Sequence, residues 1–507
     1  MPRLFVVTAA AAVAAIALPA AAIAKPVAAP NNEIGHVEYP GMQKIRYRYG
    51  PITINPGQNV IRINASDLHP KVPGFITRFE PNLVRVKDNS VPRVDILHLH
   101  HAVWLVNGYP TFAAGEEKTV IQAPRGFGWK VNGNENWAVN DMLHNLIPTP
   151  DRVYLTWDID FVPLSTPAGQ AMKGTRTQWM DVAGLASYPV FDARRGMGTK
   201  GRYTFPDQAT GAERNKIGFA KEWRVPHDVT IVQTAGHLHP GGLWTDLTVT
   251  RNGVTKRLFR SRAKYFEPAG AVSWDVAMYG TPANWRVRLK AGDLVKVSAT
   301  YDTSKASWYE SMGIMPLAVH DGSDGGGVDP FVSPVPQQGV LTHGHLPEND
   351  NHGGGPGGLP DARKLLSGSA VGGNLKISDF VYTRGDLSLT GRAGRPPVVR
   401  QGGSITFENL DATIQTPNET SEYHTITACR APCSAQTGIA YPLANGPRDF
   451  DSGELGYGPA GFTAAANRNT WATPKTLAPG TYTYFCRIHP FMRGAFRVVK
   501  SKTSKRA

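Results

Sequence analysis

Hydrophobic residues alternate with polar ones in short runs along most of the chain, and Gly, Pro and Asn interrupt these runs. A period of two, with no amphipathic pattern longer than a few helical turns, predicts β-strands. The clearest runs fall into three groups along the chain. They are 84–86, 94–99 and 153–159, then 229–233, 247–250 and 294–300, and finally 377–382, 404–407, 481–485 and 495–499.

This grouping predicts an all-β protein. We expect two antiparallel, jelly-roll-like β-sandwiches over 37–200 and 201–320, and a third sandwich over 375–500. Residues 321–374 are crowded with Gly, Pro, Asp and Asn, which is typical of a linker. The length of 507 residues agrees with several separate cores.

The N-terminus has the pattern of an export signal. Arg3 precedes an apolar run over 4–21, and Ala22-Ile23-Ala24 fits a small-x-small cleavage site before Lys25. We therefore expect residues 1–24 to be a signal peptide and the mature chain to be secreted, in the periplasm or at the cell surface. No stable membrane insertion is expected after cleavage, and an uncleaved anchor helix is the alternative.

The formal net charge is +14, and the basic residues are scattered along the chain. No nucleic-acid-binding motif accompanies them, so nucleic acid is not an expected partner. An acidic redox partner or an anionic cell surface is the interaction that such a charge favours.

The chain has three cysteines. Cys429 and Cys433 are spaced to close a small disulfide loop in an oxidising compartment. This leaves Cys486 outside that disulfide. A single thiol outside the cell is a hazard unless it is buried or holds a metal.

Cys486 opens the strongest motif of the chain. It follows a predicted strand, and His489 and Met492 follow it at intervals of three residues. His424 is the other histidine of this C-terminal segment. One thiolate, two imidazoles and a distant thioether are the ligands of type 1 blue copper. The alternative is a buried cysteine beside a core methionine and a surface histidine.

With this motif, roughly the last 125 residues resemble the cupredoxin (plastocyanin-like) family. The resemblance implies a Greek-key sandwich with His424, Cys486, His489 and Met492 around one copper ion. It also implies electron transfer with a redox partner protein or a small reductant, since such a site leaves no position open for a substrate.

A second group of histidines lies in the N-terminal half. His98, His100 and His101 occupy four positions of one predicted strand, while His237 and His239 form a His-x-His pair. Residues two apart share a face of a strand, so His101 joins His100 on one ion only at a bulge or through its nearer ring nitrogen. Hydrogen bonding in a polar core is the alternative role.

These runs, together with a Met that follows Tyr301-Asp302-Thr303, resemble the type II copper, ascorbate-dependent monooxygenases, the peptidylglycine α-hydroxylating and dopamine β-monooxygenase group. The resemblance covers roughly 60–325. In that family two sandwiches each hold one copper across a solvent cleft. It implies a first site of His100, His101 and His144, with His98 as the alternative third ligand, and a second site of His237, His239 and Met312, with Met315 as the alternative thioether.

The family's disulfides are missing here, since 60–325 contains no cysteine. Two functions stay open: a secreted copper-binding electron-transfer protein, or a copper-dependent monooxygenase that receives electrons from the fused cupredoxin. The sequence leaves undecided whether the chain is an enzyme. For His343, His345 and His352 we expect a solvated loop, with a metal site as the alternative. For His36, His69, His227 and His320 we expect surface or core roles.

Overall fold

The computed structural model describes the chain in segments. They are residues 34–55, 62–92, 97–115, 117–145, 150–184, 189–194, 196–210, 222–239, 241–266, 276–304, 308–344, 361–378, 381–387, 394–412, 424–430, 450–453, 455–456, 468–486 and 492–501. The side chains of His144 and Cys429 lie outside this description. The predicted signal peptide, Cys433, His345, His352 and His489 also lie outside the described residues.

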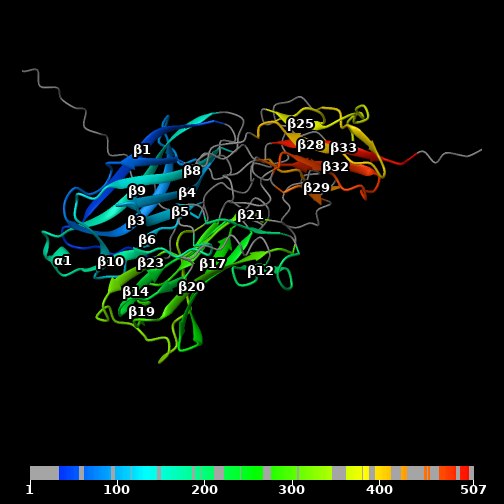
Figure 1. Ribbon diagram of the computed structural model, residues 1–507. Helices are drawn as coiled ribbons and strands as arrows, with labels where there is room; N and C mark the ends of the chain where they lie inside the picture. Colours follow the sequence, from blue (N-terminus) through cyan, green and yellow to red (C-terminus); the bar gives the residue numbers. More distant parts are fainter. Residues whose placement is uncertain are drawn as a thin grey trace, which may run out of the picture.

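The described segments form an all-β protein, as predicted. The one helix among them is the short α1 (Pro167–Gln170), which Thr166 caps by accepting a hydrogen bond from the backbone of Gly169. No helix of the described residues is both long and apolar enough to cross a membrane. Blue and cyan strands, green strands and yellow-to-red strands form three successive groups (Figure 1).

The largest sheet has nine strands in the order β1-β9-β3-β7-β10-β23-β14-β19, with β6 paired to β3. Its strands are β1 (Gln43–Ile54), β3 (Gly74–Arg85), β6 (Ile121–Gln122), β7 (Phe127–Val131), β9 (Asp151–Pro163), β10 (Lys173–Gln178), β14 (Val229–Thr234), β19 (Val287–Leu289) and β23 (Leu317–Asp321). The sheet continues from the first half of the chain into the second, because β10 pairs with β23.

A four-stranded sheet in the order β2-β8-β4-β5 completes the first sandwich. Its strands are β2 (Arg62–Ser66), β4 (Leu97–Val106), β5 (Tyr109–Gly115) and β8 (Trp137–Asn145). Alternate residues of both sheets point inward and pack into one core, in which Phe79 lies between the rings of Trp104 and Phe112.

The second sandwich pairs its share of the large sheet with a seven-stranded sheet, ordered β12-β20-β16-β17-β18-β24 with β13 on β20. These strands are β12 (Arg202–Phe205), β13 (Glu222–Arg224), β16 (Gly242–Arg251), β17 (Val254–Tyr265), β18 (Val276–Gly280), β20 (Leu294–Asp302) and β24 (Val340–Leu341). Two small sheets adjoin them: β11 (Phe191–Ala193) with β21 (Trp308–Ser311), and β15 (His237–Leu238) with β22 (Gly313–Ile314).

The C-terminal sandwich has a four-stranded and a five-stranded sheet, ordered β26-β25-β28-β31 and β27-β33-β32-β29-β30. Their strands are β25 (Leu375–Ser378), β26 (Val381–Tyr382), β27 (Val398–Arg400), β28 (Thr406–Asn409), β29 (Thr427–Arg430), β30 (Phe450–Asp451), β31 (Thr470–Ala472), β32 (Gly480–Phe485) and β33 (Arg493–Val499). Cys486 and Met492 belong to the core between the sheets.

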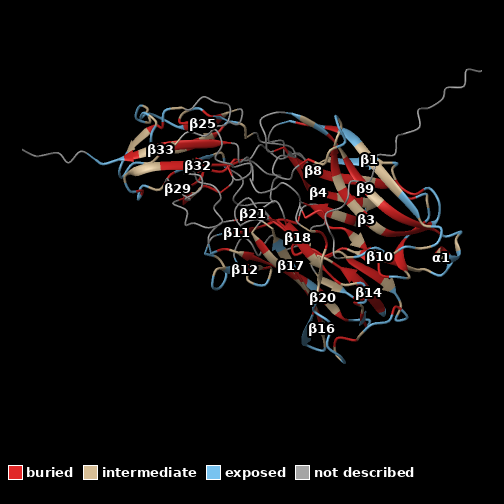
Figure 2. Cartoon of the chain, turned by 180° about the vertical axis from the view of Figure 1, so that it is seen from behind, coloured by how far each residue is buried: buried red, intermediate tan, exposed pale blue. Residues whose placement is uncertain are grey.

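Most runs that the alternation singles out are strands, with corrections. Residues 94–96 of the run 94–99 lie outside the described residues, and the run 404–407 is displaced by two residues from β28. The run 377–382 is a hairpin, because Ile377 pairs with Tyr382. The run 84–86 is the end of the longer β3, which stops at Arg85 because a turn follows. Figure 2 shows buried residues concentrated in the strands and exposed residues in many of the connecting loops.

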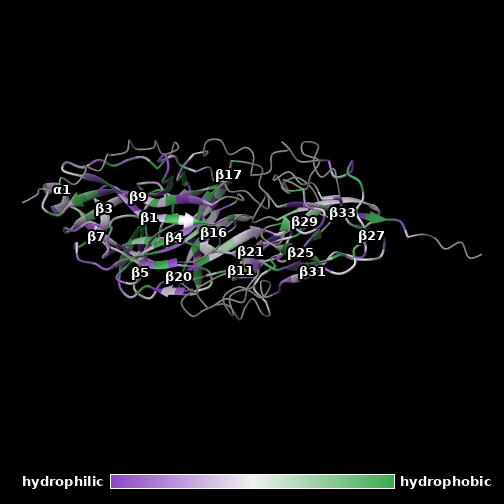
Figure 3. Cartoon of the chain, turned by 90° about the horizontal axis from the view of Figure 1, so that it is seen from above, coloured by the Kyte–Doolittle hydropathy of each residue, from purple (hydrophilic) through white to green (hydrophobic). Residues whose placement is uncertain are grey.

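Part of the Gly/Pro-rich segment packs on the second sandwich. Val328, Phe331 and Val335 lie against its core, and Asp329 accepts hydrogen bonds from Arg251 at 2.9 and 3.0 Å. The C-terminal body lies beyond β21 and β11 (Figures 1 and 3). Phe485, at the end of β32, belongs to the buried cluster of the second sandwich.

Candidate functional site

The C-terminal site joins three of the four residues that the cupredoxin resemblance nominates. Sγ of Cys486 lies 3.9 Å from Nδ1 of His424, and both side chains are fully buried. Met492 is equally buried in the same cluster, and its carbonyl accepts a hydrogen bond from the backbone of Cys486 at 3.2 Å. His489, the fourth nominated ligand, lies outside the described residues, so its role stays a prediction.

Backbone pairing on both sides fixes this arrangement. His424 exchanges backbone hydrogen bonds with Leu455, and the amide of Asn409 donates to the Leu455 carbonyl at 2.7 Å. On the other side, β29 pairs with β32, which ends at the residue before Cys486. The backbone N–H of Thr425 donates to the Cys486 sulfur at 3.3 Å. Nδ1 of His424 and Sγ of Cys486 therefore face each other in the core.

The acid Asp411 orients the imidazole. Its Oδ2 lies 2.9 Å from Nε2 of His424, which leaves Nδ1 toward the sulfur. Burial opposes a positive charge on His424, but the hydrogen bonds with Asp411 and Cys486 raise its pKa to about 9. The sequence analysis missed Asp411, because an aspartate 13 residues before a histidine has no characteristic spacing.

The spacing of the two ligand atoms fits a copper ion. Metal–nitrogen and metal–thiolate bonds of about 2.0 and 2.3 Å, at a trigonal angle of about 120°, separate the two atoms by roughly 3.7 Å. The observed 3.9 Å between His424 Nδ1 and Cys486 Sγ agrees with that span.

The proposed disulfide is untested, because Cys433 and the side chain of Cys429 lie outside the described residues.

The second group of histidines lies where the two N-terminal sandwiches meet. His100 and His101 come from β4, and His237 and His239 from β15 and the residue after it. All four are buried. The pairing of β4 with β8 shifts between Leu99 and His101, so His100 is the extra residue of a bulge. This bulge is the irregularity that the adjacent pair His100-His101 requires.

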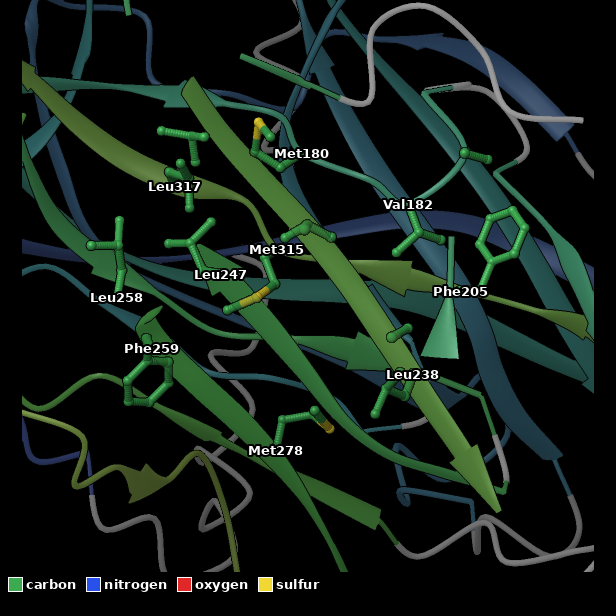
Figure 4. Packing of buried hydrophobic residues seen from close by; sticks show 14 of the residues in the cluster. Met180, Val182, Phe205, Leu238, Leu247, Leu258, Phe259, Met278, Met315 and Leu317 are labelled. Atoms are coloured by element: carbon green, nitrogen blue, oxygen red, sulfur yellow. The ribbon is translucent and has the colours of Figure 1, made fainter. Parts of the chain in front are cut away.

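The other nominated residues divide between the site and the core. His98 is buried opposite His144 on β8, whose side chain is outside the described residues. Met312 lines a pocket together with His237. Met315 instead packs among Met180, Leu247 and Leu317 in the core of the second sandwich (Figure 4). Met312 is therefore the thioether near the histidines.

The hydroxyl of Tyr301 holds the His239 and Met312 segments together. It accepts hydrogen bonds from the backbone N–H groups of His239 and Met312 at 3.0 and 3.2 Å, and it donates to the Met312 carbonyl at 2.7 Å. Next to it, β15 pairs with β22, so that His237 is opposite Ile314. This pairing gives the Tyr-then-Met pattern of the sequence a structural role.

Glu117 is a site residue that the sequence analysis missed. Its Oε2 lies 2.9 Å from Nδ1 of His237, and its Oε1 accepts a hydrogen bond from the backbone of Gly115 at 3.0 Å. Burial opposes ionisation of Glu117, but the contact with His237 holds its pKa below the usual value. A separation of 120 residues between the two side chains gave no signal in the sequence.

His100 and His101 are neutral imidazoles at neutral pH. Burial, reinforced by the neighbouring histidines, lowers the pKa of each to about 3. The neutral form is the one that binds a metal. Nε2 of His101 lies 3.4 Å from Oδ1 of Asn140, and within the described residues its Nδ1 has no hydrogen-bond partner.

A pocket opens beside these residues. It measures about 840 Å³ including its open mouth. His101, His237 and Met312 line it, and Val103, Trp179 and Ile314 add apolar walls. Its residues come from both sandwiches, so the pocket lies between them.

The remaining histidines of the described segments have structural contacts. The prediction of a solvated loop is wrong for His343, which is 2% exposed and stacks on Phe266. Its segment is held against the second sandwich, because β24 pairs with β18 and the backbone N–H of Thr342 donates to the Met278 carbonyl. His320 contacts Asp324 at 2.7 Å and His36 contacts Asp160 at 2.5 Å. Ring nitrogens of His69 and His227 lie near the carbonyls of Pro70 and Asp228.

Comparisons with known structures include a weak similarity to a copper protein. No family model and no curated protein matches the chain. A copper-containing nitrite reductase from Thermus scotoductus matches 55% of this chain and 59% of its own length, with 14% identity and a TM-score of 0.16. A structure of Sulfolobus turreted icosahedral virus matches 57% of this chain and 96% of its own, with 10% identity and a TM-score of 0.12. Similarity this low adds nothing to the assignment of either site.

Proposed function

We propose that the chain is an exported electron-transfer protein whose C-terminal sandwich binds one type 1 copper ion. The observation that carries this proposal is the contact between Nδ1 of His424 and Sγ of Cys486, two fully buried groups 3.9 Å apart. His424, Cys486 and Met492 would hold the ion, with His489 as the fourth ligand. Bound copper supplies a one-electron couple.

The protein's own part is to hold the ligands rigidly and to exclude water. Asp411 keeps the imidazole turned toward the sulfur, and the Thr425 N–H stabilises charge on that sulfur. Because the side chains of His424, Cys486 and Met492 are fully buried, no substrate reaches them. Such a centre suits exchange of electrons with a partner protein or a small reductant.

Copper loading of the full-length chain tests this proposal. Addition of Cu(II) should produce an intense blue thiolate-to-copper absorption, and Cys486→Ser should abolish it. Met492→Leu should keep the colour and change the reduction potential. Met315→Leu is the matched control, because Met315 is an equally buried methionine in another core. A blue colour that persists in Cys486→Ser would refute the assignment.

The second candidate is a copper-dependent oxygenase that receives electrons from the fused cupredoxin. The pocket between the sandwiches favours it, because histidines and a thioether share that pocket with apolar walls. A small apolar substrate suits such walls. Copper-dependent oxygen consumption with a reductant should disappear in His237→Ala/His239→Ala while the blue absorption is kept. If the wild-type chain consumes no oxygen with any reductant, this candidate is excluded.

A further inference from the structure

The four histidines of the N-terminal half are grouped differently from the two-site arrangement that the monooxygenase resemblance implies. Ring centroids lie 5.7 Å apart for His100 and His101, and 5.1 Å apart for His237 and His239. The shortest of these separations, 4.6 Å, joins His100 to His239 across the two sandwiches. Residues assigned to different coppers are therefore closer than residues assigned to the same copper.

These separations fit ligands of one ion. A nitrogen binds a metal at about 2.0 Å, so two imidazoles on the same ion have centroids roughly 4.5–5.5 Å apart. The separations of 4.6 and 5.1 Å fall within this range, and the separation of 5.7 Å between His100 and His101 lies just above it. Among the described residues no three such side chains already meet at metal-binding distance, so the rings would turn inward on binding. Two ions held across a solvent cleft do not fit rings this close.

Hydrogen bonds outside the group of rings set which nitrogen each ring offers. Glu117 accepts from Nδ1 of His237, which leaves the Nε2 lone pair of that ring for an ion. Asn140 accepts from Nε2 of His101, which leaves Nδ1. A buried carboxylate on a histidine is the usual outer support of a metal ligand, and Glu117 is 1% exposed.

A glycine at position 115 leaves room for the contact between Glu117 and His237. A Cβ atom at Gly115 would lie 2.5 Å from Cε1 of His237 and 2.8 Å from Oε2 of Glu117. Gly115 is also the strand partner of His101. The close approach of His237 to β5 therefore depends on the glycine at position 115, which has no side chain.

We propose that His100, His101, His237 and His239 bind one copper ion in a single site shared by both N-terminal sandwiches, with Glu117 as a positioning residue. This proposal is independent of the type 1 site, and it replaces the two separate coppers of the oxygenase candidate by one. Imidazole ligands suit copper, which binds such sites most tightly among the divalent first-row ions.

Copper binding by the full-length Cys486→Ser chain tests the single site, because this background removes the thiolate ligand of the C-terminal centre. Titration with Cu(II) alone should give one bound ion with the electron paramagnetic resonance signal of nitrogen-ligated type II copper. His100→Ala and His239→Ala should each weaken the binding of that ion at least tenfold. The double variant should affect the binding of the same single ion. His320→Ala, a histidine that contacts Asp324, is the matched control.

Two results would overturn the proposal. One is binding of two ions, of which His100→Ala removes one and His239→Ala removes the other. The other is absence of copper from the folded Cys486→Ser chain. The blue absorption of the wild-type chain is measured separately, so either result leaves the type 1 proposal standing.

Glu117→Gln tests the positioning role. The apparent Kd for Cu(II) should rise about 10–100-fold, because the amide no longer fixes the His237 ring as the carboxylate does. The resonance signal should keep its nitrogen ligands, which distinguishes a turned ligand from a lost one. An unchanged Kd would remove Glu117 from the site.

Discussion

The hydroxyl of Tyr301 connects the two chain segments that carry His239 and Met312. It bonds to three backbone groups of His239 and Met312. The ring itself is fully buried, and burial raises its pKa far above the usual value. The phenol therefore stays protonated at any ordinary pH, and it acts as a fixed donor and acceptor.

Tyr301→Phe should lower the free energy of unfolding by about 1–3 kcal/mol, because buried backbone groups lose their partner. It should also weaken copper binding in the N-terminal half, since the His239 segment is released. Chemical denaturation and copper titration measure the two effects. The control is Tyr484→Phe, because within the described residues the buried hydroxyl of Tyr484 has no hydrogen-bond partner. Equal losses in both variants would contradict the role of Tyr301.

A single residue, Asp141, makes the stability of the fold depend on pH. It is 1% exposed on β8, and burial raises its pKa to about 6, although Arg62 works in the opposite direction. The folded state therefore favours the protonated acid. Below the unfolded value of 3.8 both states are protonated and no penalty exists, while above about pH 6 both are ionised and the penalty is complete.

Asp141→Asn should therefore stabilise the chain at pH 7–8, by at most about 3 kcal/mol, and have little effect below pH 4. Thermal unfolding followed across this pH range measures the difference. A stabilisation that is equal at pH 4 and pH 8 would show that the charge of Asp141 is not its cause.

At the residue scale the sequence predicts candidate metal ligands better than it predicts the residues that orient them. Cys486, Met492 and His424 are recognisable because a copper ligand set has a spacing. Asp411 and Glu117 are not, because a residue that only orients a ligand comes from wherever the fold brings a carboxylate. The sequence favours Met312 and leaves Met315 as an alternative, and the packing of Met315 into the core separates the two.

At the scale of elements, the bulge in β4 and the glycine opposite it determine the histidine geometry. His100 is the inserted residue, and Gly115 on β5 pairs with His101. Alternation in the sequence predicts strands such as β9, β14 and β20, because each buries one face or both. It cannot place a bulge or a hairpin such as β25–β26, since these depend on the partner strand.

Gly115→Ala should displace the His237 ring, because the new Cβ would lie 2.5 Å from its Cε1. Copper affinity of the N-terminal half should fall roughly 10–100-fold, as for loss of other outer supports. Gly174→Ala is the matched strand control, because its Cβ would be 3.5 Å from the nearest atom. The prediction is wrong if both variants bind copper like the parent chain.

At the scale of the molecule, Phe485 connects the C-terminal sandwich to the second one. It is fully buried in the cluster that also contains Leu238, the residue between His237 and His239. The next residue along the chain is Cys486, whose side chain belongs to the C-terminal core instead. The last residue of β32 and the residue after it thus serve two bodies, which composition and periodicity do not reveal.

Phe485→Ala should destabilise the contact between these bodies by about 3–5 kcal/mol, the usual cost of removing a buried phenylalanine. We expect calorimetry of the copper-loaded chain to resolve a separate transition for the C-terminal sandwich, with the blue absorption retained at low temperature. Val499→Ala, a change at a partly exposed position of the same body, is the control. A single transition that merely moves to lower temperature would argue against Phe485 as the connection.

The sheet that runs from β1 to β19 crosses from the first sandwich to the second without interruption. A hydrogen-bonded sheet resists the hinge motion that separate domains allow, so the two histidine pairs keep their separation before any ligand arrives. An ion entering between them would then meet a backbone that is already in place, and only the imidazole rings would have to turn toward it. It would therefore lose little affinity to the ordering of the chain.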